Sequence, residues 1–572
     1  MTKCSLILAF GGTLLAQTAS DSQRLLQSSM EALNRGELVT AEQGFLKLSR
    51  EAPRSAELHD LLGYTLMLQN KSTPALAELR QATVLAPTLG PAVAHLAEAL
   101  AQSGDSKGAL EQFRRAISLG NAEPETYIAY AHSLSAAGDN AQAEAQLQKA
   151  LRLDGENGQS WDDLGSVLVQ EGKLADAKSA FEKAASVDGD LISAQLHLGV
   201  VLLQQGHPSE AVNHLAIAAQ KQPQNASTHF YLGEAYRQQR QFDKAVPELQ
   251  HAVDLSPGNA EPLAELGLAL QTSGETERAI IAFRDAVKLQ PDNPALRNDL
   301  GLALTQGAQL EQAVPEFQRA IALAPKDHGY RNNLGIAYLQ RADFDAAKAE
   351  FERAIQLAPE NAEAHYNLGL ALKLKDQLPE AVAEFKKAIQ FAPEMPDPHY
   401  TLGVTLWQTG EFEPSAEQLS EALKIKPDYA EAWYTLGTVY RQQGKLPDAA
   451  KALREAIRLQ PDFAGAHSTL ASVLKAQGDS QGAATENKVA ADLRTSKMGE
   501  QAANFSTNSG IRLLNAGDLQ GAISQFEDAM KADPNFLPAH RELAIALRRA
   551  GQTEKAAKED AWVRQMRVPD RP

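Results

Sequence analysis

Two short segments of the sequence match the Gly-x-Ser-x-Gly motif of serine hydrolases. They are Gly104–Gly108 (GDSKG) and Gly478–Gly482 (GDSQG). In a hydrolase, this motif holds the nucleophilic serine on a strand–turn–helix elbow, next to a histidine and an acidic residue. Here both copies fall between two amphipathic helical segments, where glycine followed by aspartate and serine is typical of a turn and a helix N-cap. The motif therefore predicts turns, and the lack of any other catalytic pattern predicts a protein that is not an enzyme.

Histidine is the second residue type that could carry chemistry, because its ring binds metals. The thirteen histidines form no His-Glu-x-x-His motif, and the one cysteine, Cys4, leaves no cysteine pair to complete a zinc site. Trp161 and Trp433 occupy the same position of a 34-residue period as six of the histidines. Those six are His59, His229, His365, His399, His467 and His540. A position that accepts both residue types indicates partly buried packing, so we expect neither a metal nor a cofactor.

The 34-residue period describes the helices that carry these residues. In residues 362–395, Leu368 and Leu372 recur at helical spacing before a polar break, and Pro379 suits the first turn of a second helix. Pro393 ends that helix, since the residue before a proline is disfavoured in helical geometry. The unit is therefore an antiparallel helix pair, and a tandem array of such units predicts one all-α solenoid.

The period also divides the chain into parts. Residues 1–21 form a leader, residues 22–497 form fourteen units without gaps, and residues 503–570 form two more units. Between them, Met498–Ala502 (MGEQA) is an insert that shifts the register by five residues. No remaining stretch is long enough for a separate catalytic domain.

The insert allows two interpretations. It lengthens the second helix of the fourteenth unit, or it forms a joint in the array. Asn487 replaces the phenylalanine or leucine that this helix usually carries, and the weaker packing favours a joint. The last unit ends in an amphipathic, charged segment, Thr553–Arg567, which predicts a capping helix.

Small residues recur in the first helix of almost every unit, as at Gly335 and Gly369. A glycine inside a helix costs up to about 1 kcal/mol relative to alanine, so its repetition indicates close helix approach. The pattern Trp-Leu-Gly-Tyr-Ala-Phe-Ala-Pro is followed, with one conservative change, by Trp433, Leu436, Gly437, Tyr440, Ala449, Leu453, Ala456 and Pro461. On these residues the chain resembles the tetratricopeptide repeat (TPR) family over 22–497 and 503–570. The resemblance implies a right-handed superhelix of helix pairs whose concave groove is lined mainly by each first helix.

Residues at five positions around each first-helix glycine face the groove in TPR geometry: three and two before it, and one, four and five after it. In the repeats near residues 366–475, these positions carry aromatic and cationic side chains. They are Tyr366, Tyr400, Trp407, Tyr434, Lys373, Arg441 and Lys475. Aromatic residues with cationic neighbours are typical of interface hot spots. We predict a partner-binding patch here, although tyrosine is also common in the family at this position, where it partly packs.

Three asparagines, Asn332, Asn333 and Asn367, lie just N-terminal to the patch and are added to the predicted site. They resemble the asparagine ladder in the TPR superhelix of O-linked N-acetylglucosamine transferases. The ladder is discontinuous here, because acidic residues such as Asp163 and Glu265 occupy other rungs. The resemblance leaves open a second hypothesis, a targeting or adaptor subunit of a glycosyltransferase that acts with a separate catalytic chain.

The leader predicts the compartment. Met1–Lys3 is a short positive start, and Cys4–Ala16 is an apolar run followed by small residues. This order is typical of a secretory signal peptide, and the run is short for a membrane span. We expect export to the periplasm or beyond in a bacterial envelope. The alternative is an uncleaved apolar helix that caps the array of a cytoplasmic protein.

The net charge limits the choice of partners. The chain carries 55 Lys and Arg against 72 Asp and Glu, a formal charge of −17, which argues against a general nucleic-acid binder. Apolar segments after the leader are broken by charges, glycine or proline, so no integral membrane segment is expected there. The leading hypothesis is a non-catalytic scaffold that binds an extended peptide or partner segment in the concave groove, during envelope assembly or secretion. Self-association remains possible.

Overall fold

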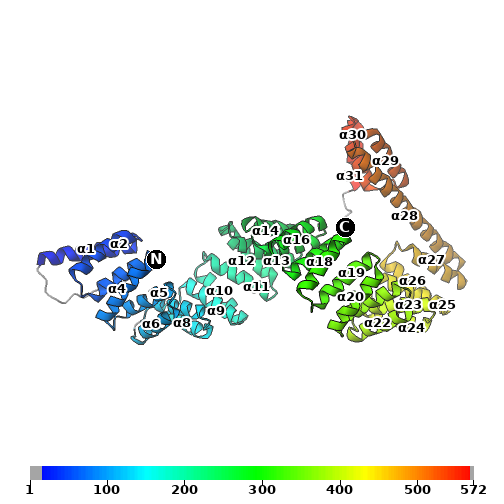
Figure 1. Ribbon diagram of the computed structural model, residues 1–572. Helices are drawn as coiled ribbons and strands as arrows, with labels where there is room; N and C mark the ends of the chain where they lie inside the picture. The colour runs from blue at the N-terminus through cyan, green and yellow to red at the C-terminus, as the bar shows by residue number, and fades with distance from the viewer. Residues whose placement is uncertain (1–15, 121, 567–572) are drawn as a thin grey trace. The chain divides into compact units, whose positions relative to one another are not determined.

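The computed structural model describes residues 16–120 and 122–566, which form α-helices joined by short turns and contain no strand (Figure 1). The chain divides into two compact units, Met1–Asp292 and Asn293–Pro572. The first unit contains α1 (Ala16–Asn34), α2 (Leu38–Glu51), α3 (Ala56–Leu68), α4 (Ser72–Leu85), α5 (Gly90–Gln102), α6 (Ser106–Ser118), α7 (Pro124–Ala136), α8 (Asn140–Leu153), α9 (Gly158–Gln170), α10 (Leu174–Val187), α11 (Ile192–Gln204), α12 (Pro208–Lys221), α13 (Ala226–Gln238), α14 (Phe242–Leu255), α15 (Ala260–Thr272) and α16 (Thr276–Leu289).

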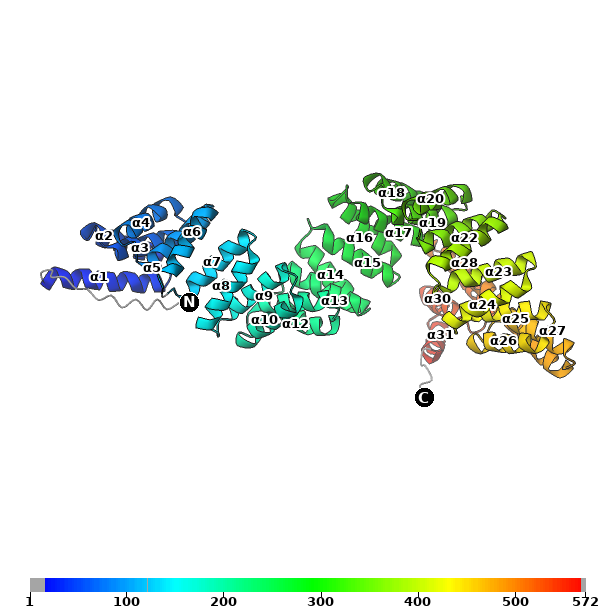
Figure 2. The ribbon, with the colours of Figure 1, turned by 90° about the horizontal axis from the view of Figure 1, so that it is seen from below.

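The second unit continues the same alternation of first and second helices. It contains α17 (Pro294–Gln306), α18 (Leu310–Leu323), α19 (His328–Gln340), α20 (Phe344–Leu357), α21 (Ala362–Leu374), α22 (Leu378–Phe391), α23 (Pro396–Thr409), α24 (Phe412–Ile425), α25 (Ala430–Gln442), α26 (Leu446–Leu459), α27 (Ala464–Ala476), α28 (Ser480–Asn515), α29 (Leu519–Ala532), α30 (Leu537–Arg549) and α31 (Thr553–Met566). The predicted all-α solenoid of helix pairs is confirmed, and Figure 2 shows the pairs from a second direction.

The pair formed by α21 and α22 shows how the sequence produces the hairpin. A tight turn with Asp376 at φ 60° joins the two helices, and Pro379 lies in the first turn of α22. Gly369 of α21 faces the fully buried ring of Phe385 in α22, and a Cβ atom on this glycine would lie 2.5 Å from the ring. The glycine therefore admits the ring, which confirms the close helix approach that the sequence predicts.

Histidines at the repeated position pack between the two helices of a pair. His365 places Nδ1 2.6 Å from Glu384 on the second helix and Nε2 3.0 Å from the carbonyl oxygen of Pro359. Trp433 makes the corresponding bond, donating from Nε1 to the carbonyl oxygen of Pro427 at 2.9 Å. The packing interpretation of these histidines is confirmed. Among the described residues, no group of three or more His, Cys, Asp and Glu could hold a metal ion.

Both Gly-x-Ser-x-Gly segments lie at helix starts. Asp105 accepts a hydrogen bond from the backbone N–H of Gly108, and Asp479 accepts one from Gly482. The serine of each motif is the first residue of its helix, α6 or α28. The turn and N-cap interpretation is therefore confirmed.

Met498–Ala502 lies within one continuous helix, α28, and Figure 1 shows it unbroken. Of the two interpretations of the insert, the structure shows the lengthened helix. The helix is not interrupted at the insert. The C-terminal half of α28 packs against α29 and α30. A Cβ atom on Gly499 would lie 2.6 Å from the carbonyl oxygen of Ala532, so the insert itself packs against the end of α29.

The two ends of the described chain can be compared with the predicted leader and the predicted capping helix. Residues 1–15 of the predicted leader lie outside the described residues, and α1 begins at Ala16. No described helix combines the length and the apolarity needed to cross a membrane. At the other end, α31 covers the predicted capping segment up to Met566, and its Ala556 and Val563 are buried; Arg567 lies outside the described residues.

First helices form the inner side of each curved unit. In the second unit, α19 packs on α21, α23 on α25, and α25 on α27, whereas contacts between consecutive second helices are weaker or absent in the described parts of the chain. A stack whose members approach more closely on one side curves toward that side. The side chains of the first helices therefore line the concave face, as the TPR resemblance implies.

Candidate functional site

The predicted tyrosines lie on three consecutive first helices of the second unit. Tyr366 is on α21, Tyr400 on α23 and Tyr434 on α25, and each is half-buried. The phenol of Tyr366 shares a 3.3 Å hydrogen bond with the hydroxyl of Thr401 on the next first helix. The rings are therefore held against the stack but keep an exposed edge.

Two aromatic residues that the sequence reasoning missed extend this row. Tyr429 packs on Tyr400 with ring centroids 4.8 Å apart, and Phe463 packs on Tyr434 at 4.7 Å. Both occupy the N-cap of a first helix, and neither makes a side-chain cap hydrogen bond. An available signal was the residue type at this position, because asparagine or aspartate caps most earlier first helices. Asn361, for example, accepts a hydrogen bond from the N–H of Ala364.

The phenols of Tyr366, Tyr400 and Tyr429 remain protonated at neutral pH, because the pKa of each is raised. Burial raises the pKa of Tyr366 and of Tyr400. Burial, followed by the neighbouring Asp397 carboxylate, raises the pKa of Tyr429, which donates a 3.2 Å hydrogen bond to Asp397. Lys426 lies 4.5 Å from the centroid of the Tyr429 ring. The hydroxyl groups of Tyr366 and Tyr429 already bond to Thr401 and Asp397, so the ring faces and edges are the main contact surface of this row.

Trp407 and three cations occupy one repeated position, four residues after the glycine or alanine of the first helix. Trp407 is half-buried and packs against an apolar cluster that includes Leu419 and Leu436. Lys373 is half-buried, and burial alone lowers its pKa. The cations differ in exposure, but none of the three has an ion pair within the described residues. They are Lys373, Arg441 and Lys475.

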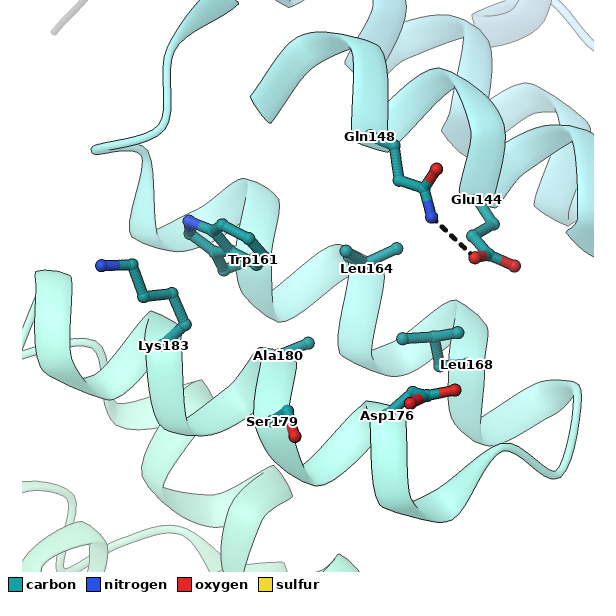
Figure 3. Close-up of a pocket in the computed structure, with 9 residues that line it drawn as sticks. All are labelled: Glu144, Gln148, Trp161, Leu164, Leu168, Asp176, Ser179, Ala180 and Lys183. Carbon is teal, nitrogen blue, oxygen red and sulfur yellow. Dashed lines mark hydrogen bonds between the residues drawn. The ribbon is translucent and has the colours of Figure 1, made fainter. Parts of the chain in front are cut away.

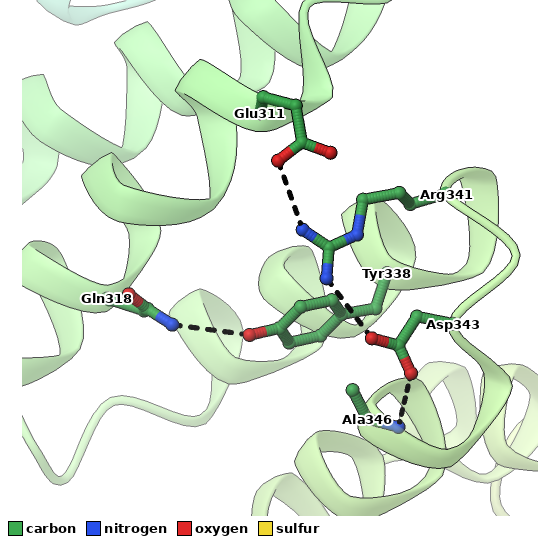
Figure 4. Close-up of polar contacts among 6 residues, drawn as sticks. All are labelled: Glu311, Gln318, Tyr338, Arg341, Asp343 and Ala346. Carbon is green, nitrogen blue, oxygen red and sulfur yellow. Dashed lines mark hydrogen bonds and ion pairs between the residues drawn. The ribbon is translucent and has the colours of Figure 1, made fainter.

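Arg441 is the most constrained of these cations. Its Nε atom is buried and has no hydrogen-bond partner among the described residues. Another cation of the same unit, Arg341, is neutralised by acidic side chains. Figure 4 shows Arg341 bonded to Glu311 and to Asp343, with its guanidinium carbon 5.2 Å from the ring centroid of Tyr338. Arg341 thus has two acidic partners, whereas Arg441 has none within the described residues.

The three predicted asparagines connect adjacent first helices. Asn367 donates to the side-chain oxygen of Asn332 at 3.0 Å, and Asn332 donates to Glu363 at 3.1 Å. Asn333 donates to Asn298 at 2.8 Å. Asn332 and Asn367 are 5% and 7% exposed. Their amides are engaged within the protein, so the aromatic and cationic side chains present the more accessible recognition groups. The assignment of the asparagines, the aromatic residues and the cations to a partner-binding site stays a prediction.

Two hollows lie outside the concave face, at equivalent positions of two repeats. Figure 3 shows the first, where Trp161 and Leu164 form the floor between α8, α9 and α10. Trp433 and Leu436 form the floor of the second, between α24, α25 and α26. In both repeats the second helix carries a buried alanine, Ala180 or Ala452, where histidine-bearing repeats carry Glu384 or its equivalent. The hollows follow from this exchange of a polar pair for tryptophan and alanine.

Comparison with known families gives one result over most of the chain. A family model described as tetratricopeptide repeat matches residues 128–190, 196–260, 265–328, 332–396, 400–462, 434–496 and 507–565. A second model with the same description matches residues 90–115. No curated protein matches the sequence.

Three solved structures are similar to parts or most of the chain. MamA is 24% identical, with 29% of this chain and 96% of MamA covered and a TM-score of 0.28. The Cut9–Hcn1 hetero-tetramer of the APC/C contains a chain that is 14% identical, with coverages of 92% and 96% and a TM-score of 0.35. YrrB, described as a TPR protein with an unusual peptide-binding site, is 23% identical, with coverages of 32% and 95% and a TM-score of 0.28. Likenesses at these TM-scores do not bear on partner or function.

Proposed function

The chain belongs to the tetratricopeptide repeat family, and we propose that it is a non-catalytic scaffold that binds an extended partner segment on the concave face of its second unit. The observation that carries this proposal is the row of half-exposed aromatics on α21, α23 and α25, bordered by cations without partners in the described residues. Interaction between a protein and a peptide or protein segment is the general role of this fold.

The aromatic row provides the contact area that a narrow ligand requires. Tyrosine and tryptophan contribute large apolar surfaces at a low cost in side-chain entropy, and they are enriched among binding hot spots. Here Tyr400 and Tyr434 are already held by Tyr429 and Phe463, so little further ordering is needed when a ligand binds. The four rings and Trp407 therefore form a prepared surface.

The proposal is tested by site-directed crosslinking in the native cell. A photo-crosslinking amino acid at Val404, which follows the repeat glycine of α23, should capture a partner that the same probe at Lys386 on α22 does not capture. The captured partner is then measured against purified wild-type protein and Y400A/W407A. We expect at least a tenfold loss of affinity with unchanged helicity by circular dichroism.

A control variant separates a local loss from a general one. Tyr231→Ala removes a half-buried tyrosine from α13 in the first unit and should leave the affinity unchanged. Equal affinity of wild type and Y400A/W407A for the captured partner would place the binding surface elsewhere.

We further propose that the scaffold works in the bacterial envelope, in assembly or secretion. The support is the apolar leader after a positive start at Met1–Lys3. Mass spectrometry of the N-terminus of the native protein should find the leader removed before residue 22. An intact N-terminus would favour the cytoplasmic alternative.

The adaptor role in a glycosyltransferase receives less support. It rests on Asn332, Asn333 and Asn367, whose amides bond to other side chains of the chain. Transferase activity that purifies together with the native protein would support this role, and its absence from intact native complexes would exclude it.

A further inference from the structure

We propose that the segment bound by the second unit is acidic, with carboxylate side chains at three-residue intervals around an apolar residue that contacts Trp407. The proposal rests on the proposed function and specifies the chemistry of the ligand. It follows from one position of the repeat, four residues after the glycine or alanine of the first helix.

Four consecutive first helices carry functional side chains at this position. α21 carries Lys373, α23 carries Trp407, α25 carries Arg441 and α27 carries Lys475. The spacing of 34 residues places them in one row along the concave face. The order along the row is cation, indole, cation, cation.

The same chain contains closed versions of this position. Arg237 of α13 lies 2.7 Å from the carboxylate of Glu265 on the next first helix, α15. Arg548 of α30 lies 2.7 Å from the carboxylate of Asp560 on α31. Both remaining cations at this position are thus neutralised by an acidic residue of the chain itself.

The open versions lack that acidic residue. Glu265 stands 28 residues after Arg237, and the same step from Lys373 and Arg441 leads to Thr401 and Thr469. Threonine cannot neutralise a cation, and burial already lowers the pKa of Lys373. A half-buried cation is stabilised by an opposite charge or by a charge-assisted hydrogen bond. A carboxylate supplied by the partner would take the place that Glu265 fills in the first unit.

Geometry sets the interval between the partner's carboxylates. Packed helices lie roughly 8–10 Å apart, and an extended segment rises about 3.3 Å per residue. Adjacent members of the row are therefore about three residues apart along the ligand. The expected ligand pattern is acid-x-x-apolar-x-x-acid-x-x-acid, read in either chain direction.

The overall charge of −17 does not prevent this recognition. At physiological ionic strength the Debye length is about 8 Å, so distant acidic residues of the chain are largely screened. Direct pairs with partly buried cations are screened much less. Local charge therefore decides which segment binds, and net charge acts mainly on the rate of encounter.

The test selects binding peptides from a random library of 12-residue peptides, using the full-length protein. Wild type should enrich acidic peptides with the three-residue pattern. K373Q/R441Q should lose this acidic preference, and the selected peptide should bind it at least tenfold more weakly. The matched control is K386Q/R454Q, which removes two exposed cations from one repeated position of the second helices α22 and α26. The control should select the same peptides as wild type.

The outcomes separate this proposal from the proposed function. Enrichment of neutral or basic peptides that is lost in Y400A/W407A would overturn the acidic specificity and leave the binding surface in place. Enrichment that Y400A/W407A retains, or no enrichment by wild type, would overturn both. Equal binding of the selected peptide and a copy with glutamine in place of each glutamate would also overturn the acidic specificity.

Discussion

Arg237 in the first unit and Arg441 in the second occupy the same place in their repeats, yet only Arg237 has an acidic neighbour. The buried Nε atoms of both arginines make no well-aligned hydrogen bond. The Nε of Arg237 nevertheless lies 2.7 Å from the carboxylate of Glu265, within ion-pair distance, whereas Arg441 has no ion pair in the described part of the chain. The backbone around the two residues is the same, a 13-residue first helix in each case. The same repeat position can therefore hold a cation with or without an acidic partner in the chain, without a change of fold, and the proposed binding site depends on this difference.

The polar contacts between adjacent first helices also differ between the two units. In the first unit, His95 bonds to Asp60 at 2.8 Å and His197 bonds to Asp162 at 2.9 Å. The equivalent contact in the second unit joins the neutral groups of Tyr366 and Thr401. Burial would lower the pKa of His95, but the carboxylates of Asp60 and Glu98 together outweigh burial and raise that pKa. These contacts between first helices therefore include histidine–carboxylate pairs in the first unit, whereas the equivalent contact at Tyr366 in the second unit is uncharged.

The largest expected effect tests whether the helix pairs of the two units pack in the same way. Gly199 and Gly335 each face a buried side chain, and a Cβ atom would lie 2.4 Å from Leu215 or from Phe351. Valine at either position should lower the free energy of unfolding by about 2–3 kcal/mol, because overpacking forces the facing side chain to move. Chemical denaturation of G199V and G335V measures this cost.

Gly258→Ala provides the control, because the added Cβ atom meets nothing within 4 Å. It should change stability little. If only one of the two valine variants lowers the free energy of unfolding, the helix packing differs between the units. The inner faces of the two units could then not be compared position by position.

The second effect contrasts the paired and the unpaired cation directly. Burial raises the pKa of Glu265 although Arg237 offsets part of this, so the pair itself adds little net stability. Glu265→Gln removes the carboxylate that lies 2.7 Å from the partly buried Arg237 and should cost about 1–2 kcal/mol. Arg441→Gln removes a cation that has no partner and should cost under about 0.5 kcal/mol. Equal costs in denaturation would contradict the distinction between closed and open positions.

The third effect concerns the helix starts. Asn225 of the first unit caps α13 by accepting from the N–H of Thr228, so Asn225→Ala should cost about 1 kcal/mol. Tyr429→Asn in the second unit restores a capping side chain to α25 but removes the ring that holds Tyr400. We expect its stability to change by less than that of Asn225→Ala, with a clear loss of peptide binding. If Y429N binds normally, the packed ring is not part of the site.

Most of the fold could be predicted from sequence because its determinants are local and repeat. Pro379, Gly369 and the partner ring of Phe385 recur with the 34-residue period, so each copy strengthens the same inference. The insert was harder, since Asn487 weakens packing but does not interrupt helical propensity, and α28 continues through Met498–Ala502.

The site was only partly predictable for a different reason. Repeat position indicates which residues face inward, and the aromatic and cationic rows are predicted from it. It does not show which polar groups are already engaged, and Asn332 and Asn367 bond to each other. Tyr429 and Phe463 lie at N-cap positions, which are not among the five repeat positions expected to face the groove.

The smallest expected change in stability comes from a substitution that gives Arg441 an acidic partner within the chain. Thr469 stands where Glu265 stands in the first unit, so Thr469→Glu places a carboxylate within reach of Arg441. A partly exposed ion pair contributes about 0.2–1 kcal/mol, so the gain in the free energy of unfolding should be small. The effect on binding should be larger, because an internal carboxylate competes for the cation that an acidic ligand requires. Thr469→Gln is the uncharged control. If T469E and T469Q bind an acidic peptide equally well, Arg441 does not act through its charge, and the difference between the two arginines is structural only.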